Sequence, residues 1–197
     1  MKKLLILGIL ASFQAAYTAE NKLDLDLLHY AVDNALLQEA LADGACIDYV
    51  ADNSRHYSTY YDGYTPIYLA VNSFVLNCSD SRLEKVKMLL DKGVPNTINH
   101  ACYNSEKSPL AKAIFDYCLM ISEQRKPLFQ ALIIELIRHG ADINEDSCQQ
   151  VVTAIETRIE TTPDDQRNRA QDRIAEVHDM YDEYRPRTSW LKMEFVD

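Results

Sequence analysis

A helix-ending pattern that recurs three times along the chain constrains its fold more than any other feature. In each copy an apolar stretch is followed by a glycine, at Gly44, Gly93 and Gly140. Glycine at this place lets the backbone leave a helix in the left-handed conformation that other residues avoid. The stretches before the second and third glycines carry apolar residues at helical spacing, namely Val86, Leu89 and Leu90, then Ile133, Leu136 and Ile137. A helix is therefore expected to end at each glycine.

A second pattern predicts the start of a further helix before Gly93 and of another before Gly140. Thr65-Pro66 and Ser108-Pro109 place a hydroxyl side chain at a helix N-cap and proline at the first helical position. Small residues follow where the two helices of a pair would pack closely, namely Ala70 and Ala113. Because a pair of short helices cannot bury its apolar face alone, the pairs must stack on one another. The sequence thus predicts an all-α fold, built as a helical-repeat solenoid.

These residues resemble the ankyrin repeat family over roughly residues 24–147. Residues 62–70, Asp-Gly-Tyr-Thr-Pro-Ile-Tyr-Leu-Ala, are similar to its helix-opening motif, with Tyr68 where the family usually has histidine. Residues 136–144, Leu-Ile-Arg-His-Gly-Ala-Asp-Ile-Asn, are similar to its helix-closing motif. The resemblance implies about three repeats within residues 20–147. They are divergent, because the glycines lie 49 and 47 residues apart, against a family period of about 33.

The repeat pattern fades after residue 147, and residues 148–184 are expected to form a capping helix pair. The first helix is predicted from Cys148 to Ile159, with an apolar side made of Val151, Ala154, Ile155 and Ile159. Thr162-Pro163 opens the second, whose apolar stripe is Ile174, Val177, Tyr181 and Tyr184. A pair with one polar face is what a solenoid needs at its end. Residues 185–197 are expected to be a tail.

The first nineteen residues have the layout of a secretory signal peptide. Lys2 and Lys3 precede an apolar run of about ten residues and then small residues. The run is shorter than the roughly 20 residues that span a bilayer. The alternative is an N-terminal helix that stays in place, and the cleavage site is imperfect, because Tyr17 or Gln14 occupies the position where a small residue is preferred. The mature protein is expected in the periplasm or outside the cell, without membrane insertion.

The charge of the chain excludes some partners. The formal net charge is −10, and loss of residues 1–19 removes two lysines and no acid, which takes it to −12. A phosphate backbone must be met by clustered Lys and Arg, so nucleic acid is not expected. A basic protein partner, or a partner without strong charge, suits this chain better.

Catalytic and metal-binding patterns are missing from the sequence. The five histidines are dispersed, and no nucleophile elbow or glycine-rich phosphate loop occurs. None of the cysteines is spaced as C-x-x-C or clustered with histidine as zinc ligands are. We therefore expect no enzymatic activity, no metal and no cofactor.

The segment from Asp48 to Tyr64 is the expected binding element. It has five tyrosines in 17 residues, and tyrosine gives a large amphipathic contact area at low entropic cost. The family resemblance implies binding through such inter-repeat loops and the adjoining face of the first helices. The expected partner-binding residues are Tyr49, Tyr57, Tyr60, Tyr61, Asp62, Tyr64, Tyr68 and Tyr103. Alternatively, the enlarged loop folds onto its own solenoid and its tyrosines pack there.

Five cysteines allow two disulfides if the protein is exported. Cys102 and Cys148 occupy nearly equivalent places after consecutive glycines, and Cys78 and Cys118 both lie between paired helices. Bonds 102–148 and 78–118 would join adjacent units and leave Cys46 free. Unpaired cysteines that pack as small hydrophobic residues are the alternative.

Two functions remain open. The first is an exported scaffold that binds one protein, in a sharper version an inhibitor or immunity protein for a toxin or enzyme. The second is a secreted effector that binds host proteins through an ankyrin module and retains residues 1–19.

Overall fold

The computed structural model describes residues 34–51, 63–94, 96–102, 107–120, 122–160 and 163–186. Within these ranges the protein is all-α, with no strand beyond an isolated bridge between Cys102 and Lys107, as the sequence predicted. Its α-helices are α2 (Asn34–Ala42), α3 (Pro66–Leu76), α4 (Asp80–Lys92), α5 (Pro109–Leu119), α6 (Lys126–Arg138), α7 (Asp146–Ile159) and α8 (Asp164–Tyr184). A short 3-10 turn, η2 (Glu123–Arg125), precedes α6.

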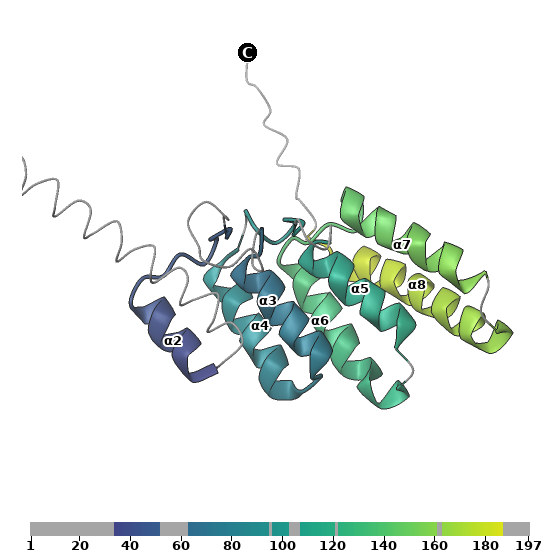
Figure 1. Cartoon of the computed structure of the whole chain (residues 1–197), viewed down its shortest axis with the longest axis horizontal. Coiled ribbons are helices and arrows are strands. Elements are labelled where there is room, and N and C mark those ends of the chain that lie inside the picture. Colours follow the sequence, from purple (N-terminus) through teal and green to yellow (C-terminus); the bar gives the residue numbers. More distant parts are fainter. Residues whose placement is uncertain are drawn as a thin grey trace, which may run out of the picture.

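Consecutive helices pack in pairs, α3 with α4, α5 with α6 and α7 with α8. The first helices of the pairs form one row, because α3 packs on α5 and α5 on α7. The second helices form another row, in which α4 packs on α6 and α6 on α8. Figure 1 shows the pairs side by side, with α2 at one end and α7 and α8 at the other.

The predicted starts of α3 and α5 are confirmed. Thr65 is the N-cap of α3, and its hydroxyl accepts a 3.2 Å hydrogen bond from the backbone N–H of Tyr68. Ser108 caps α5 in the same way and accepts from the N–H of Ala111 at 3.3 Å. A proline follows each cap, where its missing N–H removes no helical hydrogen bond.

The predicted helix ends are confirmed as well. The backbone φ angles are 88° at Gly44, 88° at Gly93 and 98° at Gly140, a region that residues with a Cβ rarely adopt. At the end of α4, the N–H of Gly93 donates a 2.9 Å hydrogen bond to the carbonyl of Leu90. The chain therefore turns out of α2, α4 and α6 by the same device.

One hydrophobic cluster runs through the whole described part of the chain. It contains buried residues from every helix, for example Leu37 in α2 and Val177 in α8. Ala70 and Ala113 are fully buried, as expected of small residues between close helices. Phe74 of α3 and Phe129 of α6 meet edge to face, with ring centroids 5.3 Å apart. The helix pairs thus share one continuous core.

The C-terminal pair differs from the prediction in detail. Val151, Ile155 and Ile159 of α7 are buried, but Ala154 is exposed, so its assignment to the apolar side was wrong. These three residues follow i, i+4 spacing, and Ala154 lies about 100° round the helix from the middle of their stripe. Within the described residues, no helix combines the length and apolarity needed to cross a membrane.

Candidate functional site

The segments that join one helix pair to the next gather along one edge of the molecule, which we call the loop edge. They are residues 43–51 after α2, 93–108 after α4 and 139–145 after α6, within the described ranges (Figure 1). Each segment begins with the helix-ending glycine or its neighbour. The local sequence therefore sets where each loop starts, and side-chain contacts hold neighbouring loops together.

Asp48 connects the first of these segments to the second. Its carboxylate accepts a 2.8 Å hydrogen bond from the hydroxyl of Thr97 and a 3.1 Å bond from the side-chain amide of Asn96. Asp48 and Thr97 are each the fourth residue after a helix-ending glycine. The contact therefore joins equivalent positions of adjacent loops. Thr97 is 2% exposed, so its hydroxyl is satisfied by this bond in a place with little access for water.

Asn99 connects the second segment to the third. Its amide donates a 3.2 Å hydrogen bond to the carbonyl of Gly140, and its side-chain oxygen accepts a 2.9 Å bond from the N–H of Asp142. One side chain thus satisfies both a backbone donor and a backbone acceptor of the neighbouring loop. The two loops are held in a fixed register by this pair of bonds.

Asp142 connects the third segment to α8. Its Oδ1 accepts hydrogen bonds from the hydroxyl of Tyr181 at 2.7 Å and the N–H of Asn144 at 2.9 Å. Burial acts to raise the pKa of Asp142, but these donors outweigh it and lower the pKa below its ordinary value. Burial and the same carboxylate raise the pKa of Tyr181. We call the contacts of Asp48, Asn99 and Asp142 the loop ladder.

Backbone hydrogen bonds join the described residues at the two ends of the tyrosine-rich segment. The N–H of Ala51 donates to the carbonyl of Tyr64 at 2.9 Å, and the N–H of Gly63 donates to the carbonyl of Ala51 at 2.7 Å. Gly63 has a φ of 74°, which suits the tight closure. Ala51 and the Gly63–Tyr64 pair, which flank residues 52–62 in the sequence, therefore lie side by side. The ring of Tyr64 meets that of Tyr68 edge to face, with centroids 5.2 Å apart.

The structure locates three of the eight expected partner-binding residues. Tyr49 and Tyr64 are half-buried and pack against the core cluster. Tyr68 is 3% exposed, so almost none of its side chain is accessible to a partner. Its ring instead packs against that of Tyr64. The other expected residues, Tyr57, Tyr60, Tyr61, Asp62 and Tyr103, lie outside the described residues.

None of the five cysteines forms a disulfide in the structure. Neither of the expected pairs, Cys78 with Cys118 or Cys102 with Cys148, is bonded. Cys102, Cys118 and Cys148 are buried, and the sulfur of Cys148 lies 3.7 Å from the hydroxyl of Ser108. Burial raises the pKa of the Cys118 and Cys148 thiols to about 12. These cysteines behave as small core residues in the structure.

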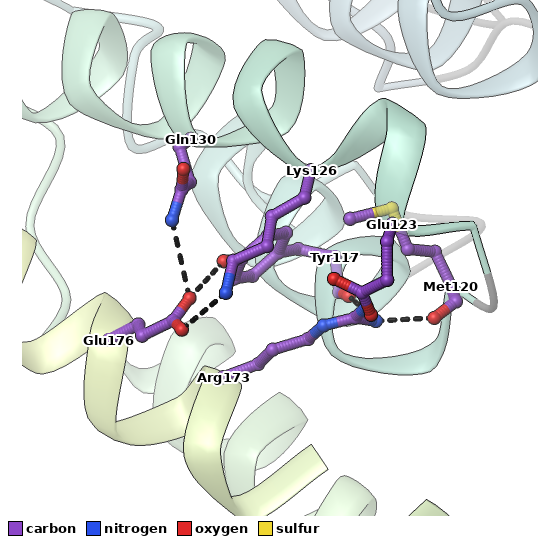
Figure 2. A network of polar contacts seen from close by, with 7 residues as sticks. All are labelled: Tyr117, Met120, Glu123, Lys126, Gln130, Arg173 and Glu176. Atoms are coloured by element: carbon purple, nitrogen blue, oxygen red, sulfur yellow. Dashed lines mark hydrogen bonds and ion pairs between the residues drawn. The ribbon is translucent and has the colours of Figure 1, made fainter. Parts of the chain in front are cut away.

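A polar network, shown in Figure 2, fastens α8 to the α5–α6 pair. The carboxylate of Glu176 accepts hydrogen bonds from Lys126 at 2.5 Å, from Gln130 at 3.3 Å and from the hydroxyl of Tyr117. Burial acts to raise the pKa of Glu176, but these donors outweigh it and lower the pKa below its ordinary value. Burial and the bond to Glu176 raise the pKa of Tyr117. Both groups thus keep their charge state near neutral pH, which suits a structural contact and not proton transfer.

Arg173 lies at the centre of the same interface and is 1% exposed. Its guanidinium donates to the carbonyl of Tyr117 at 3.0 Å and to the carbonyl of Met120, both at the C-terminal end of α5, and to Glu123 at 2.6 Å. The burial of Arg173 was not predicted, because an arginine within a highly charged helix is typical of an exposed face. Its place four residues before Val177, on the apolar stripe, was the available signal.

No cluster of three or more histidine, cysteine, aspartate or glutamate side chains suited to a metal ion occurs among the residues described above. His139 of the helix-closing motif lies with its Nδ1 2.8 Å from the carbonyl of Glu135, one helical turn back. His139 therefore has a structural contact with α6, the helix that precedes it.

In the comparisons with known proteins, no family model matches the sequence, and no curated protein matches it.

Proposed function

We propose that this chain is a divergent ankyrin-repeat protein that acts by binding a protein partner at its loop edge. The loop ladder is the observation that carries the proposal. Asp48 and Thr97 join equivalent positions of adjacent loops at 2.8 Å, and Asn99 joins the next pair. In a stack of repeats, each unit contacts only its neighbours and presents its loops in one row. The two rows of helices and the repeated positive-φ glycines support the same assignment.

The tyrosine-rich segment is the proposed contact element on this edge. Its ends are fixed by the backbone bonds of Ala51 with Gly63 and Tyr64, and Tyr64 rests on the buried ring of Tyr68. Fixing the ends of a binding segment lowers the entropy that is lost when a partner binds. Tyr49, Tyr57, Tyr60, Tyr61, Asp62, Tyr64 and Tyr103 are the proposed contact residues, and Tyr68 acts as their support.

The proposed partner is a basic protein. A chain with a formal charge of −10, or −12 without residues 1–19, attracts a basic protein over distances of about a Debye length and speeds its association. Fast capture is what an inhibitor or immunity protein for a toxin or enzyme requires.

Export is part of the same proposal. If residues 1–19 are a signal peptide, the intact mass of the protein isolated from its own cells lacks these residues or a closely similar stretch. A protein that retains the N-terminal methionine and all nineteen residues would point instead to the secreted-effector alternative.

The proposal is tested by capture of the partner from the cells that produce this protein, followed by stopped-flow association with the purified partner. We expect a partner with excess Lys and Arg, and an association rate that falls at least tenfold between low and high salt. A partner of acidic or neutral charge, with a rate insensitive to salt, would contradict the charge argument. Failure to capture any protein, with the ladder residues intact, would contradict the function.

A further inference from the structure

A cavity of about 420 Å³ lies where three helix ends meet, away from the residues of the loop ladder. Its walls come from the last turn of α5, the last turn of α7 and the first turns of α8. The volume falls within the range of roughly 300–1,000 Å³ that small-molecule sites occupy. The space is therefore large enough for an organic ligand, well beyond the size of a packing defect.

The floor of the cavity is apolar. Cys118, Ile159 and Ala170 form its deepest wall and are almost fully covered by the fold. Leu119 and Met120, at the end of α5, are half-buried and present the accessible apolar surface of the cavity. A ligand that entered would bury an apolar body against these side chains.

The polar side of the cavity carries more positive than negative charge. Arg158 and Arg169 line it together with Asp165 and Gln166, which gives a local excess of one positive charge in a chain whose net charge is −10. Positive charge that is retained next to a cavity of an acidic protein favours an anionic ligand over a cationic one.

Arg169 is the residue that most favours a bound ligand, because its charge has no partner in the described fold. Arg167, two residues earlier, is committed to the fold, because it donates to the carbonyls of Ile159 at 3.1 Å and Glu160 at 2.9 Å at the end of α7. Arg169 has no hydrogen bond or ion pair with any residue that the structure describes. Its planar guanidinium is therefore available for two parallel hydrogen bonds to a carboxylate.

We propose that this cavity binds a small organic carboxylate with an apolar tail. Arg169 would hold the carboxylate at the mouth, with Arg158 adding positive potential, and the tail would pack on Leu119 and Met120. Neither the short anions that lack a tail nor apolar amines match both halves of this cavity. The site is separate from the loop edge and does not depend on the proposed partner.

The test is isothermal titration of the full chain with octanoate, acetate and octylamine, each below the concentration at which it forms micelles. Octanoate should bind at least tenfold more tightly than acetate or octylamine, because only octanoate has both the charge and the tail. Equal binding of octanoate and octylamine, or of octanoate and acetate, would overturn the proposal.

Two variants test whether Arg169 binds octanoate. Arg169→Gln keeps the helix and should weaken octanoate binding about tenfold, the loss expected for one charge-assisted hydrogen-bonded contact. Arg185→Gln, at the far end of α8, is the matched control and should leave the affinity unchanged. An unchanged affinity in Arg169→Gln, or an equal loss in both variants, would overturn the assignment. The wild type and both variants should capture the protein partner equally well. Loss of octanoate binding can therefore be distinguished from failure of the proposed function.

Discussion

The guanidinium of Arg173 in α8 donates a 3.0 Å hydrogen bond to the backbone carbonyl of Tyr117 in α5. The carbonyls at the end of a helix have no partner within the helix. Here a side chain that is distant in sequence supplies the partner, and it also reaches the carbonyl of Met120. α8 thus caps a helix of the preceding pair, and the two pairs should unfold together.

Replacement of Arg173 should destabilise the protein strongly. Arg173→Met keeps the length of the side chain but leaves the buried carbonyl of Tyr117 without a donor, which costs about 2–4 kcal/mol when the second carbonyl is included. Urea unfolding, followed by circular dichroism, measures the loss.

Glu123→Gln is the control for this measurement. It removes the charge of the guanidinium's exposed partner, whose side chain is 62% exposed, and should cost about 1 kcal/mol or less. Equal losses in the two variants would show that the ion pair, and not the capping of α5, provides the stability.

Stability should fall in acid through Glu176. Its pKa in the folded protein lies below the ordinary value of 4.5, so its contribution is present above that value and is lost as the pH falls through the lower folded value. In Glu176→Gln this contribution is absent at every pH. The difference in free energy of unfolding between wild type and variant should therefore shrink as the pH is lowered from 6 to 3. A difference that stays constant or grows in acid would contradict the network in Figure 2.

Any side chain at Gly93 should lower the free energy of unfolding. The cause is the backbone conformation and not a lack of space. A Cβ at this position would have no atom within 4 Å, but the residue adopts φ 88° and ψ 120°. Gly93→Ala should therefore cost about 1–3 kcal/mol from backbone strain.

Lys92→Ala is the control for this glycine. Lys92 is exposed at the end of α4, and its replacement should change the free energy of unfolding by about 0.5 kcal/mol or less. Similar effects of the two substitutions in thermal unfolding would speak against a required left-handed turn.

The thiols should differ in reactivity in the native protein. Cys46 is exposed, whereas burial raises the pKa of the Cys118 and Cys148 thiols to about 12. Because the thiolate is the nucleophile, iodoacetamide at pH 8 should alkylate Cys46 much faster than the two buried thiols. Mass spectrometry of tryptic peptides follows each site. Disulfides 78–118 or 102–148 in protein purified without reductant would contradict the unbonded cysteines of the structure.

Local features of the fold could be predicted from the sequence. The caps at Thr65 and Ser108 and the turns at Gly93 and Gly140 depend on a few adjacent residues, so short motifs identify them. The all-α class follows from the same motifs.

Long-range features could not be predicted in this way. The ladder contact of Asp48 with Thr97 and the burial of Arg173 depend on which segments become neighbours after packing. A polar residue on a helix carries no mark in the sequence that tells whether it faces solvent or the carbonyls of another helix. The tyrosine-rich segment is a further example. Its composition predicts binding, but the hydrogen bond between Ala51 and Tyr64 at its ends is visible only in the structure.

The most direct test of the proposed function is the affinity of the captured partner for a variant in which Tyr57, Tyr60, Tyr61 and Tyr64 are all changed to alanine. Tyr184→Ala, on α8, is the matched control, and circular dichroism confirms that both variants are folded. If the loop edge binds the partner, the four-residue variant should raise the dissociation constant at least a hundredfold, since tyrosines in the centre of an interface often contribute 2 kcal/mol or more each, and the control should not change it. An unchanged dissociation constant in the folded four-residue variant would contradict the account.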